Sequence, residues 1–262
     1  MRGIFFFLLI PVFSFSQTYD VLFIGNSYTY YNDLPEMISS IANDFGDSIN
    51  HDQSTPGGTS LYAHSQNQAT INKINQQNWD YVVLQDQSQR PSLSPSYVAA
   101  SVYPYASQLV SLIDSNYICS EPIFYMTWGR KYGDQTNCNT YPPVCTFLGM
   151  QERLRESYLY MGVNNEATVS PVGMSFKNSI ALDSTIDLYT SDYSHPSIYG
   201  SYLAACTFYS TIFKKSSVGC TYKPSAISQS EALFLQQVAS STVLDSMSIW
   251  NIFQAKFLYN IN

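Results

Sequence analysis

Short apolar runs that alternate with amphipathic helical segments are the feature that most restricts the fold of this chain. The apolar runs cover residues 20–24, 81–84, 123–126 and 167–170, with a weaker strand pattern at 48–54. Helical periodicity occupies the intervening residues 34–45, 66–78, 97–115 and 147–161. Such alternation is typical of parallel strands joined by crossover helices. The sequence therefore predicts an α/β fold, a three-layer α/β/α sandwich around a parallel sheet of about five strands.

Proline and capping residues mark where several predicted helices begin or break. Pro104 predicts a kink or a split within residues 97–115. Pro196 opens a later helix, whose apolar face carries Ile198, Tyr202, Cys206, Tyr209 and Phe213. Ser228 and Glu231 have the spacing of a capping box, which indicates the start of a final helix.

Residues 1–16 have the pattern of a secretory signal peptide. Arg2 is followed by an apolar stretch, and the small residues Ser14 and Ser16 precede Gln17. The stretch is too short to span a bilayer comfortably, so no stable membrane insertion is expected after cleavage, although an uncleaved anchor remains the alternative. We expect residues 17–262 to form a single domain of an exported protein, either periplasmic or extracellular.

Charge and histidine content restrict the partners. The 12 Lys and Arg residues are scattered, and the formal net charge is −7. Nucleic-acid binding requires clustered positive charge, so nucleic acids are excluded as partners. The three histidines, His51, His64 and His195, lie far apart and form no Cys/His cluster, so neither a metal site nor a cofactor is predicted. The sequence does not predict an oligomeric state.

Five cysteines make disulfides possible in an exported chain. Cys138 and Cys145 bracket a short loop of turn-forming residues and are the best candidate pair. Cys206 and Cys220 are a possible second pair, and Cys119 has the position of a small buried hydrophobe. Sequence alone leaves the connectivity open.

Polar residues gather directly after the predicted strands. Gly25-Asn26-Ser27 follows the first strand, Gly57-Gly58-Thr59 the second and Gln85-Asp86-Gln87 the third. The carboxyl ends of parallel strands meet at one edge of a sheet, which is where ligands bind in such folds. These three segments, together with Asp192 and His195 before the late helix, predict one site.

The residue types at this edge suit acyl transfer. A serine hydroxyl needs a base to remove its proton, and His195 is the candidate base for Ser27. Asp192, three residues earlier, can orient the imidazole. For the oxyanion we expect the backbone N–H of Ser27, that of Gly58 (or Gly57) and the side-chain amide of Gln87, with Gln85 as the alternative amide.

These segments resemble, in order and spacing, the conserved blocks of the SGNH (GDSL-like) hydrolase superfamily. Ile24-Gly25-Asn26-Ser27 is similar to the Gly-Asp-Ser block, Pro56 to Leu61 to the isolated-glycine block, and Asp192-Tyr193-Ser194-His195-Pro196 to the Asp-x-x-His block. The resemblance implies a flavodoxin-like sandwich that hydrolyses esters, often acetyl groups on carbohydrates, without a cofactor.

Two positions depart from the usual blocks. Asn26 stands where the first block has Asp, and Val83-Leu84-Gln85-Asp86-Gln87-Ser88 lacks the Gly-x-Asn-Asp of the third. Both variants are similar to those of an exported bacterial subgroup of the superfamily. The third block places Gln87 where the superfamily has its oxyanion-hole Asn.

The functional prediction is a serine esterase that deacetylates a small-molecule or glycan ester. Trp128, Arg130 and Tyr132 follow the fourth strand and are expected to form a sugar-stacking wall. Gly57, His64 and Gln85 are further candidates for substrate contact. The alternatives are a thioesterase or lipid esterase, and a non-catalytic glycan-binding protein with the same fold.

Overall fold

The computed structural model describes residues 16–252, which contain five parallel strands. They are β1 (Thr18–Ile24), β2 (Ser48–Ser54), β3 (Tyr81–Leu84), β4 (Glu121–Tyr125) and β5 (Thr168–Ser170), in the sheet order β2-β1-β3-β4-β5. Every neighbouring pair is parallel. The predicted five-stranded parallel sheet is therefore confirmed. The predicted signal peptide lies outside the described residues, apart from Ser16.

Helices connect the strands. They are α1 (Ser27–Tyr30), α2 (Leu34–Asp44), α3 (Leu61–Gln66), α4 (Gln68–Ile74), α5 (Pro95–Ser101), α6 (Tyr103–Asn116), α7 (Phe147–Asn164), α8 (Val172–Leu182), α9 (Ile198–Phe213) and α10 (Gln229–Leu244). The short 3-10 helices are η1 (Tyr31–Asp33), η2 (Arg90–Ser92) and η3 (Pro142–Cys145). No helix between residues 16 and 252 combines the length and the apolar character that a membrane crossing requires.

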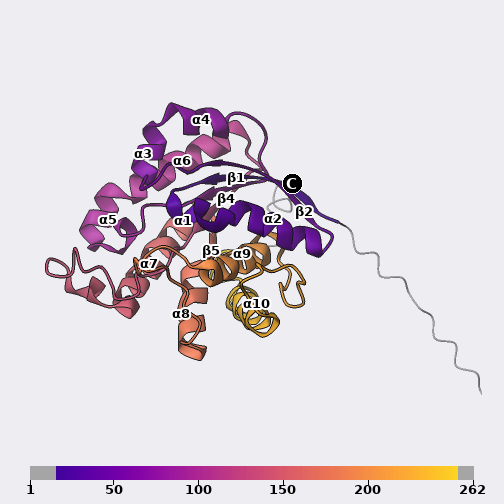
Figure 1. Ribbon diagram of the computed structural model, residues 1–262. Helices are drawn as coiled ribbons and strands as arrows, with labels where there is room; N and C mark the ends of the chain where they lie inside the picture. Colours follow the sequence, from indigo (N-terminus) through magenta and orange to yellow (C-terminus); the bar gives the residue numbers. More distant parts are fainter. Residues whose placement is uncertain (1–15, 253–262) are drawn as a thin grey trace, which may run out of the picture.

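Helices cover both faces of the sheet (Figure 1), and the sheet separates two apolar cores. Side chains alternate along a strand, so Val21 and Phe23 of β1 face one core while Leu22 and Ile24 face the other. The first core is completed by α2, α8, α9 and α10, and the second mainly by α3 to α7. Helix α9 packs against α2, α8 and α10, and all its residues from 200 to 213 are buried. The layers are those of the predicted α/β/α sandwich.

Several helix boundaries differ from the sequence prediction. The predicted helix at 97–115 is split into α5 and α6, with Pro104 in the first turn of α6. The predicted helix at 66–78 is instead α3 and α4, because Asn67 breaks it and caps α4 with its side chain. Helix α8 was not predicted. The capping box of Ser228 and Glu231 is confirmed.

Only one disulfide is present among the described residues. Cys138 and Cys145 are bonded, as predicted. The second predicted pair is wrong, since Cys206 and Cys220 are both free thiols. Cys206 belongs to α9 and is buried in the first core. The Cys220 thiol donates to the Tyr222 carbonyl at 3.5 Å. Burial raises the pKa of Cys220 to about 12, so both cysteines act as apolar core residues.

Candidate active site

The candidate nucleophile lies where β1 turns into α1. Ser27 is the first residue of α1, and the Asn26 side chain caps this helix by accepting from the Tyr28 N–H at 3.1 Å. A side chain at Gly25 would collide with Thr29 Oγ1 and Gln85 Oε1. Glycine thus leaves room for the Gln85 amide and the Thr29 hydroxyl beside the backbone that leads into Ser27 at the carboxyl edge of the sheet.

Ser27, His195 and Asp192 are brought together at this edge. His195 Nε2 lies 2.8 Å from Ser27 Oγ, and His195 Nδ1 lies 2.5 Å from Asp192 Oδ2. The other carboxylate oxygen, Oδ1, accepts the backbone N–H groups of Ser194 and His195, both at 2.9 Å. The Asp-x-x-His spacing therefore forms one closed turn in which the carboxylate orients the imidazole toward the serine.

The Asp192 carboxyl is stabilised as a carboxylate. Partial burial acts to raise its pKa, but the hydrogen bonds from the His195 ring, from two backbone N–H groups and from Thr190 Oγ1 outweigh burial. The net effect holds the pKa of Asp192 well below its ordinary value. A permanent negative charge next to His195 fixes the ring with its proton on Nδ1, which leaves Nε2 free to accept from Ser27.

Aromatic side chains support the histidine from two sides. The Tyr31 ring stacks on the His195 ring at 4.6 Å between centroids. Tyr28 Oη lies 2.6 Å from Ser194 Oγ, and the Tyr28 ring stacks on Trp128 at 4.7 Å. These contacts restrict the rotation of the imidazole and of the turn that carries it. Tyr28 and Tyr31 follow the nucleophile directly, but their sequence positions alone did not suggest this role.

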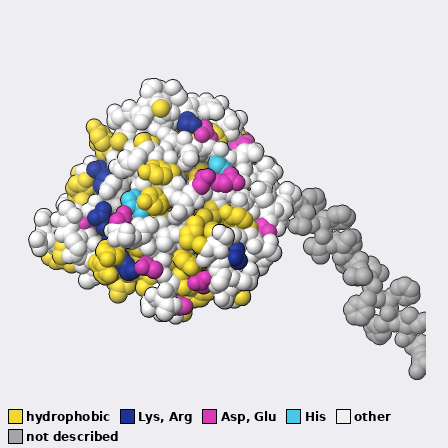
Figure 2. All heavy atoms as spheres, in the orientation of Figure 1, with side chains coloured by type: hydrophobic (Ala, Val, Ile, Leu, Met, Phe, Trp, Pro, Cys, Tyr) yellow, Lys and Arg dark blue, Asp and Glu magenta, His cyan; other side chains and the backbone are white. Residues whose placement is uncertain are grey.

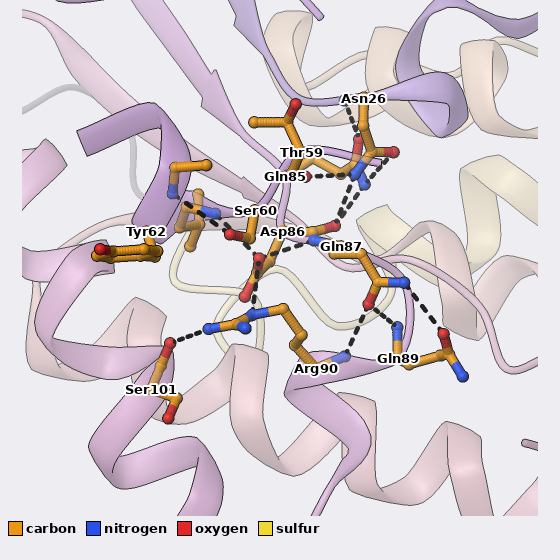
Figure 3. A network of polar contacts seen from close by, with 12 residues as sticks. Asn26, Thr59, Ser60, Tyr62, Gln85, Asp86, Gln87, Gln89, Arg90 and Ser101 are labelled. Atoms are coloured by element: carbon orange, nitrogen blue, oxygen red, sulfur yellow. Dashed lines mark hydrogen bonds and ion pairs between the residues drawn. The ribbon is translucent and has the colours of Figure 1, made fainter. Parts of the chain in front are cut away.

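Asn26 joins three loops at the sheet edge (Figure 3). Its Nδ2 donates to the carbonyls of Thr59 at 2.8 Å and Asp86 at 3.4 Å. Its Oδ1 accepts from Gln85 Nε2 at 3.0 Å as well as from Tyr28 N–H. An amide can donate and accept at once, whereas a carboxylate only accepts. This explains why Asn is suited to the position where the related block has Asp.

Asp86 links the loop of Gly57 and Gly58, after β2, to the loop after β3. The carboxyl is fully buried, and its Oδ1 accepts the N–H groups of Leu61 at 3.0 Å and Gln87 at 2.7 Å. Arg90 Nε lies 3.7 Å from the same oxygen. Burial raises the pKa of Asp86 to about 6, although these hydrogen bonds and the Arg90 charge oppose the rise. One carboxyl thus fixes two loops that carry predicted oxyanion donors.

The Gln87 side chain is half-buried and held in one orientation. Its Oε1 accepts the N–H groups of Gln89 at 2.9 Å and Arg90 at 3.2 Å, and its Nε2 donates to Gln89 Oε1 at 3.1 Å. The second N–H of this amide has no hydrogen-bond partner among residues 16–252. It is therefore available to a ligand.

Solved structures share this arrangement of strands and helices. A DUF4886 family protein from Bacteroides uniformis superposes with a TM-score of 0.74 at 19% identity, over 87% of this chain and 95% of that protein. A candidate SGNH hydrolase from Slackia heliotrinireducens gives 0.59 at 23% identity, over 74% and 98%. The acetyl xylan esterase AlAXEase gives 0.57 at 13% identity, over 74% and 99%.

The chain has the SGNH hydrolase fold. A scan of the sequence against protein-family models gave no match. A search of curated proteins gave none either. The assignment of this fold therefore rests on the three-dimensional arrangement of strands and helices, and on the spacing of the polar segments described above.

Within the SGNH hydrolase fold, Gln85 is a structural residue rather than a substrate contact. It is completely buried, and its Oε1 accepts the Asn26 N–H and the Thr29 hydroxyl, both at 2.9 Å. Its Nε2 donates to Asn26 Oδ1 and to the Asp86 carbonyl. Both ends of the amide are used inside the protein, so the expectation of substrate contact is wrong. Of the two glutamines, only Gln87 retains a free donor.

Trp128 does not form part of an exposed sugar-stacking wall. Its ring is fully buried between Tyr28 and Phe176, at 4.7 Å and 4.1 Å between centroids. Its Nε1 donates to the Ser194 carbonyl at 3.0 Å. The prediction of an exposed ring failed because the indole packs in the protein interior, under the turn of residues 192–195. Trp128 instead supports the backbone that carries His195.

The exposed aromatic side chains near the site are tyrosines. Tyr132, which was predicted, is 56% exposed and packs edge-on against Tyr193, which is 47% exposed. Arg130 lies next to them, 4.0 Å from Asp134 Oδ1. Tyr30 is also exposed, and its hydroxyl would lie 3.6 Å from a Cβ at Gly57. On the face shown in Figure 2, Lys and Arg side chains are scattered singly.

Gly57 and Gly58, in the loop after β2, are exposed next to this edge of the sheet. Gly58 has a φ of +70°, which favours glycine, while Gly57 lies near the Tyr30 hydroxyl. The Asp86 bond to the Leu61 N–H ties the end of the same loop to the loop after β3. Both glycines therefore remain candidates for the backbone donor, as the sequence left them.

His64 is a buried structural residue, so the expectation that it contacts substrate is wrong. Its Nε2 donates to the Gly25 carbonyl at 2.8 Å, and its Nδ1 accepts from Thr70 Oγ1 at 2.9 Å. Thr70 Oγ1 in turn lies 2.9 Å from Ser54 Oγ, and the Gly25 N–H donates to the Ser54 carbonyl. Burial lowers the pKa of His64 more than the Gly25 bond raises it, so the ring is neutral. The N–H and carbonyl groups of Gly25 are thus both fixed two residues before Ser27.

Replacing His64 by alanine is expected to lower the free energy of unfolding by about 2–4 kcal/mol, because it leaves the Gly25 carbonyl unpaired and opens a cavity. Urea titration at neutral pH measures this loss. His51→Ala is the matched control. The half-buried His51 ring lies 3.3 Å from Glu36 Oε2 and packs edge-on against Phe23, and its loss should cost under about 1 kcal/mol.

Comparison of wild type with His64→Ala also tests the protonation state of His64. The unfolded chain binds a proton at this ring below a pH of about 6.5, whereas the folded protein resists protonation. Stability from a neutral His64 is therefore complete above that pH and is lost as the pH falls. The difference between wild type and His64→Ala should shrink on acidification. A difference that grows on acidification would contradict the neutral assignment.

Proposed function

We propose that the chain is a serine ester hydrolase whose catalytic residues are Ser27, His195 and Asp192. The observation that carries the proposal is the continuous hydrogen-bonded path from the Asp192 carboxylate through His195 to Ser27 Oγ, with distances of 2.5 Å and 2.8 Å. Nucleophile, base and orienting carboxylate at hydrogen-bond distance form the arrangement that activates a serine hydroxyl.

In the first half-reaction, Ser27 Oγ attacks the ester carbonyl carbon while His195 Nε2 takes the hydroxyl proton. The imidazolium that forms is stabilised by the Asp192 carboxylate and by the face of the Tyr31 ring. The carbonyl oxygen becomes an oxyanion. We assign its stabilisation to the N–H of Ser27, the N–H of Gly58 (or Gly57) and the free N–H of the Gln87 amide.

Collapse of the tetrahedral intermediate breaks the bond to the alcohol, which leaves with the proton from His195. The acyl group is then an ester of Ser27. In the second half-reaction, His195 takes a proton from water, the hydroxide attacks the acyl carbonyl, and Ser27 Oγ leaves with that proton. The sum is hydrolysis of one ester to an acid and an alcohol, and no further reactant is needed.

For the substrate we propose an acetylated carbohydrate. Three exposed tyrosines, Tyr30, Tyr132 and Tyr193, lie near the site. The apolar faces of sugar rings pack on such rings, and their hydroxyls need no charged partner. One of the solved structures with this fold is named an acetyl xylan esterase. We further propose that residues 17–262 form one exported domain, which the Cys138–Cys145 disulfide favours.

An acyl-release screen tests the substrate proposal. The purified protein is incubated with acetylated xylan, with nitrophenyl acetate and octanoate, and with an acyl thioester. We expect acetate release from the polysaccharide and faster cleavage of the acetate than of the octanoate. Preference for octanoate or the thioester would indicate a lipid esterase or thioesterase. Binding of the glycan with no turnover of any substrate would indicate a glycan-binding protein.

A further inference from the structure

A series of three polar side chains connects the candidate oxyanion donor to the connection between β4 and α7, which contains the Cys138–Cys145 disulfide. Gln87 Nε2 donates to Gln89 Oε1 at 3.1 Å, and Gln89 Nε2 donates to Asp134 Oδ1 at 2.8 Å. The Gln87 and Gln89 part of this series is visible in Figure 3. Asp134 lies in the connection between β4 and α7, four residues before the Cys138–Cys145 disulfide, and neither the sequence nor the fold suggested a catalytic part for this connection.

The Asp134 side chain and backbone are held in place by hydrogen bonds. Its carboxylate is completely buried, and it accepts from the Thr136 N–H at 3.1 Å and from Asn137 Nδ2 at 2.6 Å. Its own N–H donates to the Val144 carbonyl at 2.7 Å, across the base of the loop. Gly133 precedes it with a φ of +77°, and a Cβ there would lie 2.5 Å from the Val144 oxygen. The carboxylate therefore cannot move without opening the loop.

The carboxylate determines the orientation of both amides in series. A carboxylate only accepts hydrogen bonds, so Gln89 must turn its NH₂ toward Asp134 and its oxygen toward Gln87. Gln87 must then present its NH₂ to that oxygen. The same orientation is required at its other end, where Gln87 Oε1 accepts two backbone N–H groups. The assignment of nitrogen and oxygen in both amides is thus fixed by the network.

The neighbours of Gln87 connect it to the turn of residues 192–195 and to the loop of Gly57 and Gly58. Ser88 follows Gln87 and hydrogen-bonds to the Tyr28 hydroxyl, which also contacts Ser194 Oγ at 2.6 Å. On the other side, the Gln87 N–H is held by Asp86 Oδ1, which also accepts the Leu61 N–H. Gln87 therefore lies between Ser88, which contacts the tyrosine that supports Ser194, and Asp86, which holds the end of the loop of Gly57 and Gly58.

We propose that Gln89 and Asp134 are positioning residues that aim the free N–H of Gln87 at the oxyanion. This inference rests on the proposed function and extends it to the connection between β4 and α7. It assigns to that connection a part in stabilising the transition state, through two hydrogen bonds and with no contact to substrate. A donor that is fixed before the reaction contributes more than one that must be ordered during it.

The test is a double-mutant cycle on the full chain, with a chromogenic acetyl ester as substrate. Gln87→Ala is expected to lower kcat by about 10²–10³-fold, as for loss of one oxyanion donor. Gln89→Met retains the side-chain volume but has no hydrogen-bonding groups, and it is expected to lower kcat by about 10-fold with KM within about twofold of wild type. In the Gln87→Ala background, Gln89→Met should have no further effect, because the group that it positions is absent.

Gln135→Ala is the matched control. Gln135 lies in the same loop and is exposed, and its Nε2 donates to the carbonyls of Tyr132 at 2.5 Å and Cys145 at 3.2 Å without contacting Gln89. Its kcat should stay within about twofold of wild type.

Three outcomes would overturn the proposal. A fully active Gln89→Met would exclude the positioning role. A tenfold loss that persists in the Gln87→Ala background would indicate a structural role of the loop alone. A wild type that neither hydrolyses esters nor reacts with a fluorophosphonate would overturn the proposed function together with this inference, and is thus distinguished from the first two.

Discussion

Replacing Ser27 by alanine is expected to lower kcat for an acetyl ester by about 10⁴-fold or more, because it removes the nucleophile itself. The Ser27 side chain makes one described hydrogen bond, to His195 Nε2 at 2.8 Å, and it is half-buried at the start of α1. Alanine is well tolerated in a helix, so the variant should fold as wild type does. Steady-state kinetics and thermal unfolding of the two proteins measure both statements.

Fluorophosphonate labelling provides a second measurement on the same variant. The probe reacts with an activated serine, so wild type should be labelled and Ser27→Ala should not. Ser111→Ala, at an exposed position on α6, is the control and should be labelled and active like wild type. Activity that survives in Ser27→Ala, after contaminating esterases are excluded, would refute the catalytic assignment.

The second large effect is expected for Asp192→Asn, with a loss in kcat of about 10³–10⁴-fold. The position of Oδ1 is fixed by the two backbone N–H groups of Ser194 and His195, so the oxygen of the asparagine amide will take that position. Its NH₂ group is then directed at His195 Nδ1. A donor at this position requires Nδ1 to be unprotonated, which places the proton on Nε2. The imidazole can then no longer accept the proton of Ser27.

Acid titration of stability is an independent test of the same residue. Because the pKa of Asp192 is held below its ordinary value, the carboxylate contributes stability above a pH of about 3.8 that is lost as the pH falls. The stability of Asp192→Asn should therefore fall less steeply on acidification than that of wild type. An asparagine variant with wild-type kcat would show that the carboxylate has no part in catalysis.

The sequence was sufficient to predict the sheet and the residues that meet at its edge. Apolar runs bounded by glycine and polar residues are local signals, and the 168 positions between Ser27 and His195 are bridged because parallel strands end at one edge. Helix α8 was missed because its buried face includes Ser175 and Ser179, which hydropathy does not mark as core positions.

The environment of individual side chains was harder to predict. Trp128 and His64 both follow strand ends, as a ligand-binding residue would, yet each is buried. Gln85 and Gln87 are chemically identical in the sequence, and only the backbone path decides that the first turns inward to Gly25 and the second toward Gln89 and Arg90. Such choices depend on contacts between segments that are distant in the chain, and local patterns do not contain them.

The amide at position 26 has a consequence for attempts to convert this site to the common motif. Aspartate at that position would place a negative charge against the carbonyl oxygens of Thr59 and Asp86, which now accept from the asparagine NH₂. Asn26 and Gln85 are joined through Oδ1 and Nε2, so Asn26→Asp alone is expected to weaken the connection between the loops at this edge of the sheet.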